Sequence, residues 1–188
     1  MTPLAANVLD FWFGPPPRSV RAEWFRKDAA FDASIRTHFA DAIAAALRGD
    51  ARDETSDPHD ALARVLLLDQ FTRNAFRDTP RAFSGDRAAL ATAIDAVDAG
   101  LDQALDAYGR RFLYMPFEHA EDPVMQARSV ALFRRLKDDT GEAGPLEWAE
   151  KHAAVIRRFG RYPHRNATLG RTSTPEELAF LQEPGSRF

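Results

Sequence analysis

The densest group of side chains that could do acid–base chemistry lies at Glu118, His119, Glu121 and Asp122. Glu118 and Glu121 are three residues apart and Glu118 and Asp122 are four apart, so they share one face of a helix. Such crowding suits metal ligation, general acid–base catalysis or an anionic patch that holds arginines. The spacing matches no strong metal motif, and we expect no metal site. Asp122 has a simpler alternative role, as the N-cap of the next helix.

A second group lies between residues 157 and 166, where five Arg or His residues occur within nine positions. Gly160 should end a helix here, and the carbonyls at that end account for about two of the cations. The others fall on an irregular turn, a setting in which binding residues are common. They are Arg161, His164, Arg165 and Asn166. A solvated basic loop is the simpler interpretation. The aromatic and proline residues between the charges favour an ordered turn instead. We therefore expect His164 to line a site.

The third group follows an apolar run. The residues Val65 to Leu68 would cover every side of a helix, so we expect that helix to be buried. Polar residues come directly afterwards, namely Asp69, Gln70, Arg73 and Asn74. Because buried polar groups need partners, this segment is a candidate site.

Charge spacing refines this third group. Asp69 precedes Arg73 by four residues, which is the favourable order for an ion pair on a helix. Arg73 and Arg77 repel each other at the same spacing, and a carboxylate or phosphate between them would relieve that repulsion. The alternative is that Asp69 neutralises Arg73 and that the segment only clamps the fold.

We expect the three groups to converge around a cavity of positive potential. The candidates for catalysis are Glu118, His119, His164 and Asp69. The candidates for ligand binding are Arg73, Asn74, Arg77, Gln70, Tyr114, Arg161, Arg165 and Asn166. His152 recurs at helical spacing with Trp148 and Ile156, so we interpret it as a hydrogen-bonded core histidine.

Other aromatic and imidazole residues are given structural roles. We interpret Trp12, Phe13 and the pair Trp24-Phe25 as core or lid aromatics. Two further histidines, His38 and His59, are expected at the surface.

The elements that must position these groups are helices. Capping residues precede proline at Thr2-Pro3, Asp57-Pro58, Thr79-Pro80, Asp122-Pro123, Gly144-Pro145 and Thr174-Pro175, and Glu177 completes a capping box. Gly49, Gly100, Gly141 and Gly160 follow periodic segments and should end helices. These signals predict helices at about 3–12, 28–48, 58–77, 86–99, 109–120 with a break at Pro116, 123–138, 145–159 and 174–182.

These helices predict an all-α fold of about eight helices with no sheet, in one domain over residues 1–188. Short connections favour antiparallel hairpins, pairing 28–48 with 58–77, 86–99 with 109–120, and 123–138 with 145–159. The stretch 52–56 is polar and is expected to be a loop.

Composition excludes several classes of function. The net charge of −3 offers no basic field for nucleic acid or an anionic membrane. The absence of cysteine excludes disulfides and thiol catalysis and fits a cytoplasmic location. No signal peptide or membrane span is expected. No dinucleotide or phosphate-loop motif is present, so no cofactor is expected.

Several segments together carry a family resemblance. They are DFWFG at 10–14, LLDQFTRN at 67–74, YMPFEHAE at 114–121, RFGRYPHRN at 158–166 and LGRTSTPEE at 169–177. In this order they resemble the signatures of an uncharacterised bacterial family, catalogued as domain of unknown function 924. The resemblance implies an all-helical fold of the tetratricopeptide-like superfamily, and it implies no activity.

Three functions therefore stay open. The first is a binding protein whose Arg- and His-lined groove holds an anionic small molecule or peptide. The second is a hydrolase or transferase acting on an anionic small molecule, with a Glu/His acid–base pair and arginines that stabilise an oxyanion. The third is a structural protein in which arginine–carboxylate clamps have no ligand. Whether the chain is an enzyme, and its oligomeric state, are left open by the sequence.

Overall fold

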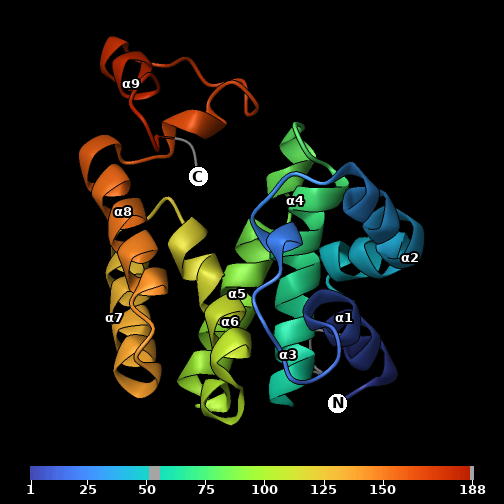
Figure 1. Ribbon diagram of the computed structural model, residues 1–188. Helices are drawn as coiled ribbons and strands as arrows, with labels where there is room; N and C mark the ends of the chain where they lie inside the picture. The colour runs from blue at the N-terminus through green and yellow to red at the C-terminus, as the bar shows by residue number, and fades with distance from the viewer. Residues whose placement is uncertain (51–55, 187–188) are drawn as a thin grey trace. The chain divides into compact units, whose positions relative to one another are not determined.

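The computed structural model describes residues 1–50 and 56–186, and all regular elements within these ranges are helical (Figure 1). The α-helices are α1 (Pro3–Phe13), α2 (Ala29–Arg48), α3 (Pro58–Val65), α4 (Thr72–Ala75), α5 (Asp86–Asp98), α6 (Ala107–His119), α7 (Pro123–Thr140), α8 (Gly144–Phe159) and α9 (Pro175–Phe180). Shorter segments are η1 (Ala22–Trp24), η3 (Leu66–Phe71), η4 (Pro80–Phe83), η5 (Leu101–Ala104) and η6 (Pro163–Arg165). The predicted all-helical class is confirmed. Most of the predicted loop at 52–56 lies outside the described residues.

Two compact units make up the chain, and each is described by itself. Unit 1 comprises Met1–Arg77 and Arg81–Pro116, and unit 2 comprises Asp78–Pro80 and Phe117–Phe188. The division therefore falls within α6. The single domain expected from the sequence stays a prediction. Within the described ranges, no helix is both long enough and apolar enough to cross a bilayer.

Local capping chemistry begins and ends the helices as expected. The side chains of Thr2, Asp57 and Asp122 accept hydrogen bonds from backbone N–H groups in the first turns of α1, α3 and α7. Thr174 and Glu177 form the predicted capping box of α9. The C-caps of α2, α7 and α8 are Gly49, Gly141 and Gly160, each in the left-handed conformation that glycine adopts without strain. Before α8, however, the N-cap is Ala143, and Gly144 is the first helical residue.

Two predicted helices differ from expectation. The helix predicted at 58–77 is divided, because the π-helical segment η3 (Leu66–Phe71) replaces regular α-helix between α3 and α4. The break predicted at Pro116 is absent, since α6 continues through this residue to His119. The polar run is buried as predicted, with Asp69 only 1% exposed and Gln70 6% exposed.

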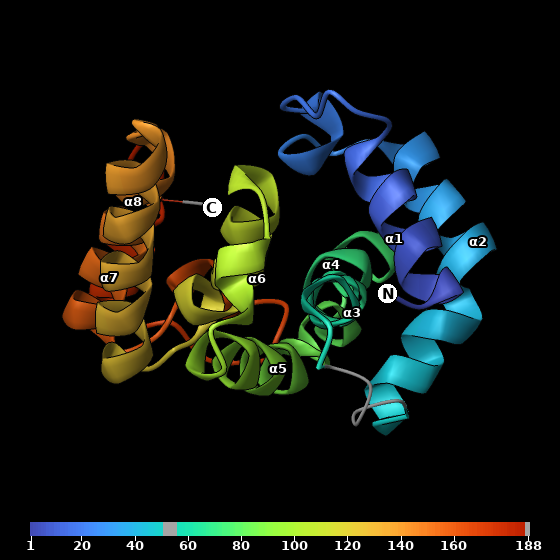
Figure 2. The same ribbon diagram turned by 90° about the horizontal axis from the view of Figure 1, so that it is seen from below.

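In unit 1, α1 packs against α3 (Figure 2), and α2 packs against η3 and α4. An aromatic core fills this region, where the ring centroid of Trp12 lies 5.6 Å from that of Phe71 and 5.3 Å from that of Phe112. Trp12, Phe13 and Trp24 are buried as predicted. Phe25 is 53% exposed, so it lies outside the core, and the other alternative given for it, a lid aromatic, stays a prediction. The α5 helix makes its main contacts with α3 and η3, so its predicted pairing with the 109–120 helix is not confirmed.

Unit 2 is built on a helical hairpin. The helices α7 and α8 lie side by side in both views (Figures 1 and 2) and pack along their length. They are joined by residues 141–143, so they run antiparallel as predicted. The ring of Phe180 on α9 packs 5.0 Å from that of Phe159 at the end of α8. The hairpin, the end of α6 and the turn around η6 together carry the candidate site.

Candidate functional site

Three imidazoles of unit 2 lie near the fully buried ring of Tyr162. The centroids of His152 and His164 each lie 5.6 Å from the centroid of Tyr162. The His119 ring is 6.4 Å from the His152 ring. The guanidinium carbon of Arg165 lies 4.5 Å from the centre of the Tyr162 ring. We name as the imidazole cluster the residues Glu118, His119, His152, His164 and Arg165.

A buried carboxylate–imidazole pair lies at the centre of this cluster. The Nδ1 atom of His152 is 3.2 Å from Oε1 of Glu118 and 2.9 Å from the backbone oxygen of Trp148. Glu118 is 5% exposed and His152 is 6% exposed. Because two oxygens face Nδ1, we assign the proton of the neutral ring to this nitrogen, which donates to both.

His152 is uncharged at neutral pH. Burial, the largest cause, lowers the pKa of His152 from 6.5 to about 3. The bond to the Trp148 carbonyl opposes this shift, and Coulomb interactions with His119, Arg165 and His164 add to it. These three cationic or protonatable groups therefore lie close enough to act on one imidazole.

The carboxyl-terminal end of α6 is held by side chains from distant segments. Gln126 Nε2 donates to the Glu118 carbonyl over 2.7 Å, and Tyr162 Oη donates to the same oxygen over 2.5 Å. Arg165 Nη1 donates to the His119 carbonyl over 3.1 Å. The last carbonyls of a helix have no partner within it, and cations stabilise them. This capping gives Tyr162 and Arg165, both in the turn at 158–166, a structural role.

Removing the Tyr162 hydroxyl should weaken this cap. Tyr162→Phe is expected to lower the free energy of unfolding by about 1–2 kcal/mol, because Gln126 Nε2 also loses the acceptor that lies 2.9 Å away. Urea unfolding followed by circular dichroism would measure the change. The control is Tyr108→Phe on the half-buried side chain of Tyr108, which should be nearly neutral. Equal effects of the two substitutions would show that the Tyr162 hydroxyl does not support the end of α6.

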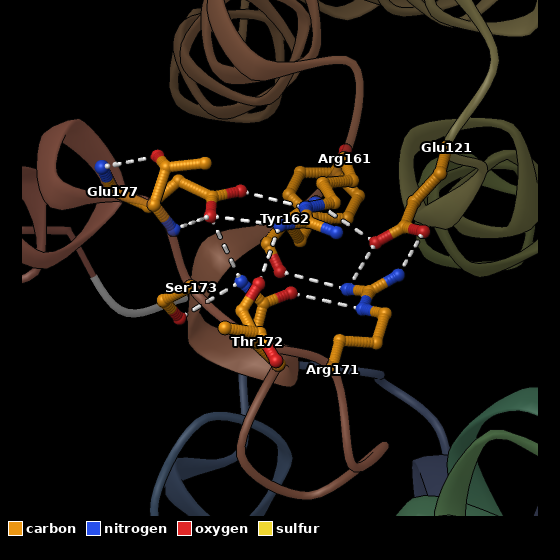
Figure 3. A network of polar contacts seen from close by, with 9 residues as sticks. Glu121, Arg161, Tyr162, Arg171, Thr172, Ser173 and Glu177 are labelled. Atoms are coloured by element: carbon orange, nitrogen blue, oxygen red, sulfur yellow. Dashed lines mark hydrogen bonds and ion pairs between the residues drawn. The ribbon is translucent and has the colours of Figure 1, made fainter.

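Beside the cluster, two arginines clamp two glutamates (Figure 3). Arg161 binds Glu177 through Nε at 2.6 Å and Nη2 at 2.8 Å. Arg171 binds Glu121 through Nη1 at 2.6 Å and Nη2 at 2.9 Å. Asn166 joins the pairs, since its Oδ1 accepts from Arg171 Nε over 2.9 Å and its Nδ2 lies 3.3 Å from Glu177.

Both glutamates of this network are ionised. The hydrogen bonds from Arg161 lower the pKa of Glu177 to about 2. Burial alone would raise the pKa of Glu121, but the bonds from Arg171 and from the Tyr162 backbone lower it overall. The network thus contains two guanidinium–carboxylate ion pairs. It holds α9 and the preceding loop against the end of α6.

In unit 1, protein carboxylates surround Arg73. Its Nη1 lies 2.8 Å from Asp69 Oδ1, which confirms the ion pair predicted from the four-residue spacing. The same guanidinium also binds both oxygens of Asp86, at 2.8 and 3.1 Å. The repulsion between Arg73 and its neighbour Arg77 is therefore offset by this chain's own acids.

Arg77 and Asn74 share one buried acid, Asp32, which is 5% exposed. Arg77 donates to the two oxygens of Asp32 over 2.7 and 2.8 Å, and Asn74 donates to Oδ1 over 2.8 Å. Burial raises the pKa of Asp32, but these hydrogen bonds lower it overall, so the carboxyl stays ionised. The group ties α2 to the segment after η3.

The other predicted residues of unit 1 also have partners within the chain. Gln70 Nε2 donates to Asp69 over 2.5 Å. Tyr114 is fully buried, and its hydroxyl donates to Asp102 over 2.5 Å. The predicted site residues therefore form two sets, one in each unit. In unit 2 the structure does bring two of the three predicted stretches together, at Glu118–Glu121 and Arg161–Asn166.

The roles of two residues in the unit 2 site were not predicted from the sequence. His152 was predicted as a hydrogen-bonded core histidine, which is confirmed, but its pairing with Glu118 was not foreseen. Arg171 received no role, because a single arginine between Gly170 and Thr172 carries no pattern. Within residues 1–50 and 56–186, no group of three or more His, Asp or Glu side chains is placed to hold a metal ion.

Comparisons with known proteins show a family and one similar fold, and they are silent on activity. The family model described as "Bacterial protein of unknown function (DUF924)" matches residues 8–185. A solved structure of a protein of unknown function from Agrobacterium tumefaciens is 42% identical, with a TM-score of 0.82. That match covers 95% of this chain and 97% of the Agrobacterium chain. No curated protein matches the sequence.

Proposed function

The chain belongs to the bacterial family of unknown function DUF924, so we propose its function from its own geometry: the imidazole cluster binds a small anion. The ligand would be the carboxylate or phosphate of a small molecule or peptide. The observation that supports this proposal is that the His119 ring lies beside His152, while His164 and Arg165 lie beside the Tyr162 ring that contacts His152. Guanidinium and imidazolium groups form strong, charge-assisted hydrogen bonds with oxyanions. His119 and His164 are partly exposed, as contact with a dissolved ligand requires.

The predicted ligand-binding arginines outside the cluster are less suited to this role. Arg73, Arg77 and Arg161 each bind a carboxylate of this chain through two nitrogen–oxygen contacts. A ligand anion would have to displace that carboxylate and leave it without its partner, which is strongly unfavourable for a buried acid such as Asp32. We therefore propose that these three arginines hold the fold.

The alternative function is catalysis by the Glu118–His152 pair. The observation that favours it is the buried contact of 3.2 Å between His152 Nδ1 and Glu118 Oε1. A general acid or base is most effective when its pKa lies near the working pH. The pKa of His152, about 3, is far below neutrality. This imidazole is therefore better suited to a fixed donor than to proton transfer, and we favour binding over a hydrolase or transferase. A cytoplasmic location stays a prediction.

Inorganic phosphate added to the protein is expected to shift the imidazole carbon–hydrogen NMR signals of His119 and His164. The signals of His38 and His59, which lie in unit 1, should stay unchanged. The double variant His119→Gln/His164→Gln should bind phosphate about tenfold more weakly or worse, because two charge-assisted contacts are lost.

The matched control is His38→Gln, at an exposed position of α2. This variant should bind phosphate as the unmodified protein does. A double cluster variant that folds, as judged by circular dichroism, and still binds phosphate with full affinity would refute the proposed site. The same conclusion would follow if phosphate shifted all the histidine signals equally.

A further inference from the structure

A row of aromatic and imidazole rings leads from the interior of unit 2 to its surface. The buried rings of Tyr162 and His152 are 5.6 Å apart. The ring of Trp148 follows, 6.5 Å from His152. Trp148 lies on α8 one turn before His152, and its backbone oxygen accepts the His152 hydrogen bond. The indole therefore borders the imidazole cluster directly.

Trp148 differs from the other two tryptophans in its exposure. Trp12 and Trp24 are buried in unit 1, at 0% and 8% exposed, whereas Trp148 is 44% exposed. An indole gains much from burial, and exposed tryptophans are enriched where proteins contact ligands or partners. The ammonium of Lys151 lies 4.4 Å from the centre of the Trp148 ring, so positive charge is present at this edge of the cluster.

We propose that the ligand of this site carries an aromatic ring beside its anionic group. The ring stacks on the indole of Trp148, while His119, His164 and Arg165 hold the phosphate or carboxylate. Stacking on an aromatic side chain accepts any flat π-system, including a nucleotide base. Lys151 adds its charge to the attraction of the anion. This inference rests on the proposed function, because it needs the anion to lie in the imidazole cluster.

Two pairs of probes test the ring while keeping the phosphate constant. They are phenyl phosphate against methyl phosphate, and adenosine monophosphate against ribose 5-phosphate. In isothermal titration calorimetry, at least one ring-bearing member should bind about tenfold more tightly than its partner. Trp148→Leu should remove this preference without weakening the binding of methyl phosphate or ribose 5-phosphate. Because Trp148 lies at the surface, this variant is expected to fold.

A matched control replaces Phe25, a strongly exposed aromatic residue of unit 1. Phe25→Leu should keep the full preference for the ring-bearing probes. Equal affinities within both pairs would overturn the aromatic inference and leave the anion site standing. A preference that survives Trp148→Leu would also overturn it. If none of the four phosphates bound, the proposed function itself would be refuted.

Discussion

Gly85→Ala is expected to destabilise the protein by about 3 kcal/mol, although it adds only one methyl group. A Cβ atom at Gly85 would lie 2.0 Å from the carbonyl oxygen of Leu68 and 2.8 Å from its carbonyl carbon. Both atoms are backbone atoms of the π-helical segment η3 (Leu66–Phe71), so no side-chain rotation can remove the clash. The conformation of Gly85, with φ −93° and ψ −10°, is open to alanine, so the close approach alone causes the effect.

The matched control is Gly144→Ala, at the first position of α8. A Cβ atom there has no neighbour within 4 Å, and alanine favours a helix over glycine by up to about 1 kcal/mol. This substitution should leave stability unchanged or raise it. The midpoint of urea unfolding measures both variants. A Gly85→Ala protein with an unchanged midpoint would contradict the packing of Gly85 against η3.

Features of the fold that depend on near neighbours could be predicted from the sequence. The caps at Asp122 and Thr174 act on backbone groups two or three residues away, so a short pattern contains the whole interaction. The π-helical segment could not be predicted in this way. An apolar run such as Val65 to Leu68 is buried on every side in either helix type, so its composition does not distinguish them.

The continuous path of α6 through Pro116 also could not be predicted from the sequence. Proline removes a backbone donor and clashes with the preceding turn, so the sequence predicts a break. In the structure, Gln126 and Tyr162 hold the carbonyl groups beyond Pro116, and they come from a later helix and from the turn before η6. These contacts stabilise the end of α6 after Pro116, and nothing within the 109–120 segment indicates them.

The candidate site likewise has features that could be predicted from the sequence and features that could not. Its charges were predicted, because guanidinium groups near one another need an oxyanion between them. The oxyanions at Arg73 and Arg77 are those of Asp86 and Asp32, which lie 13 and 45 residues away along the chain. Sequence spacing cannot pair residues at such separations. The sequence therefore predicted an anion beside these arginines and left open whether a ligand or the fold supplies it, but it could not identify Asp86 and Asp32 as the partners.

The free energy of unfolding is expected to fall as the pH drops from 6.5 to 4.5. The pKa of His152 is 6.5 in an accessible state and about 3 in the folded protein, because burial excludes its charge. Between these values the unfolded chain takes up a proton that the folded chain does not bind. His152 thus gives its full stability above pH 6.5 and loses it, at roughly 1 kcal/mol per pH unit, as the pH falls toward 3.

Substitution of His152 isolates this contribution. His152→Asn keeps an N–H donor for the Trp148 carbonyl but cannot titrate, so the slope of stability against pH should be smaller by about one proton. Glu177, whose pKa moves from 4.5 to about 2, loses its stabilising effect mainly below about pH 5 and does so equally in all the proteins compared. His38→Asn, at an exposed histidine, should keep the original slope. Urea unfolding at pH 6.5 and 4.5 measures the free energy of unfolding of all three proteins. Equal slopes of stability against pH for His152→Asn and the unmodified chain would show that His152 is not buried in its neutral form.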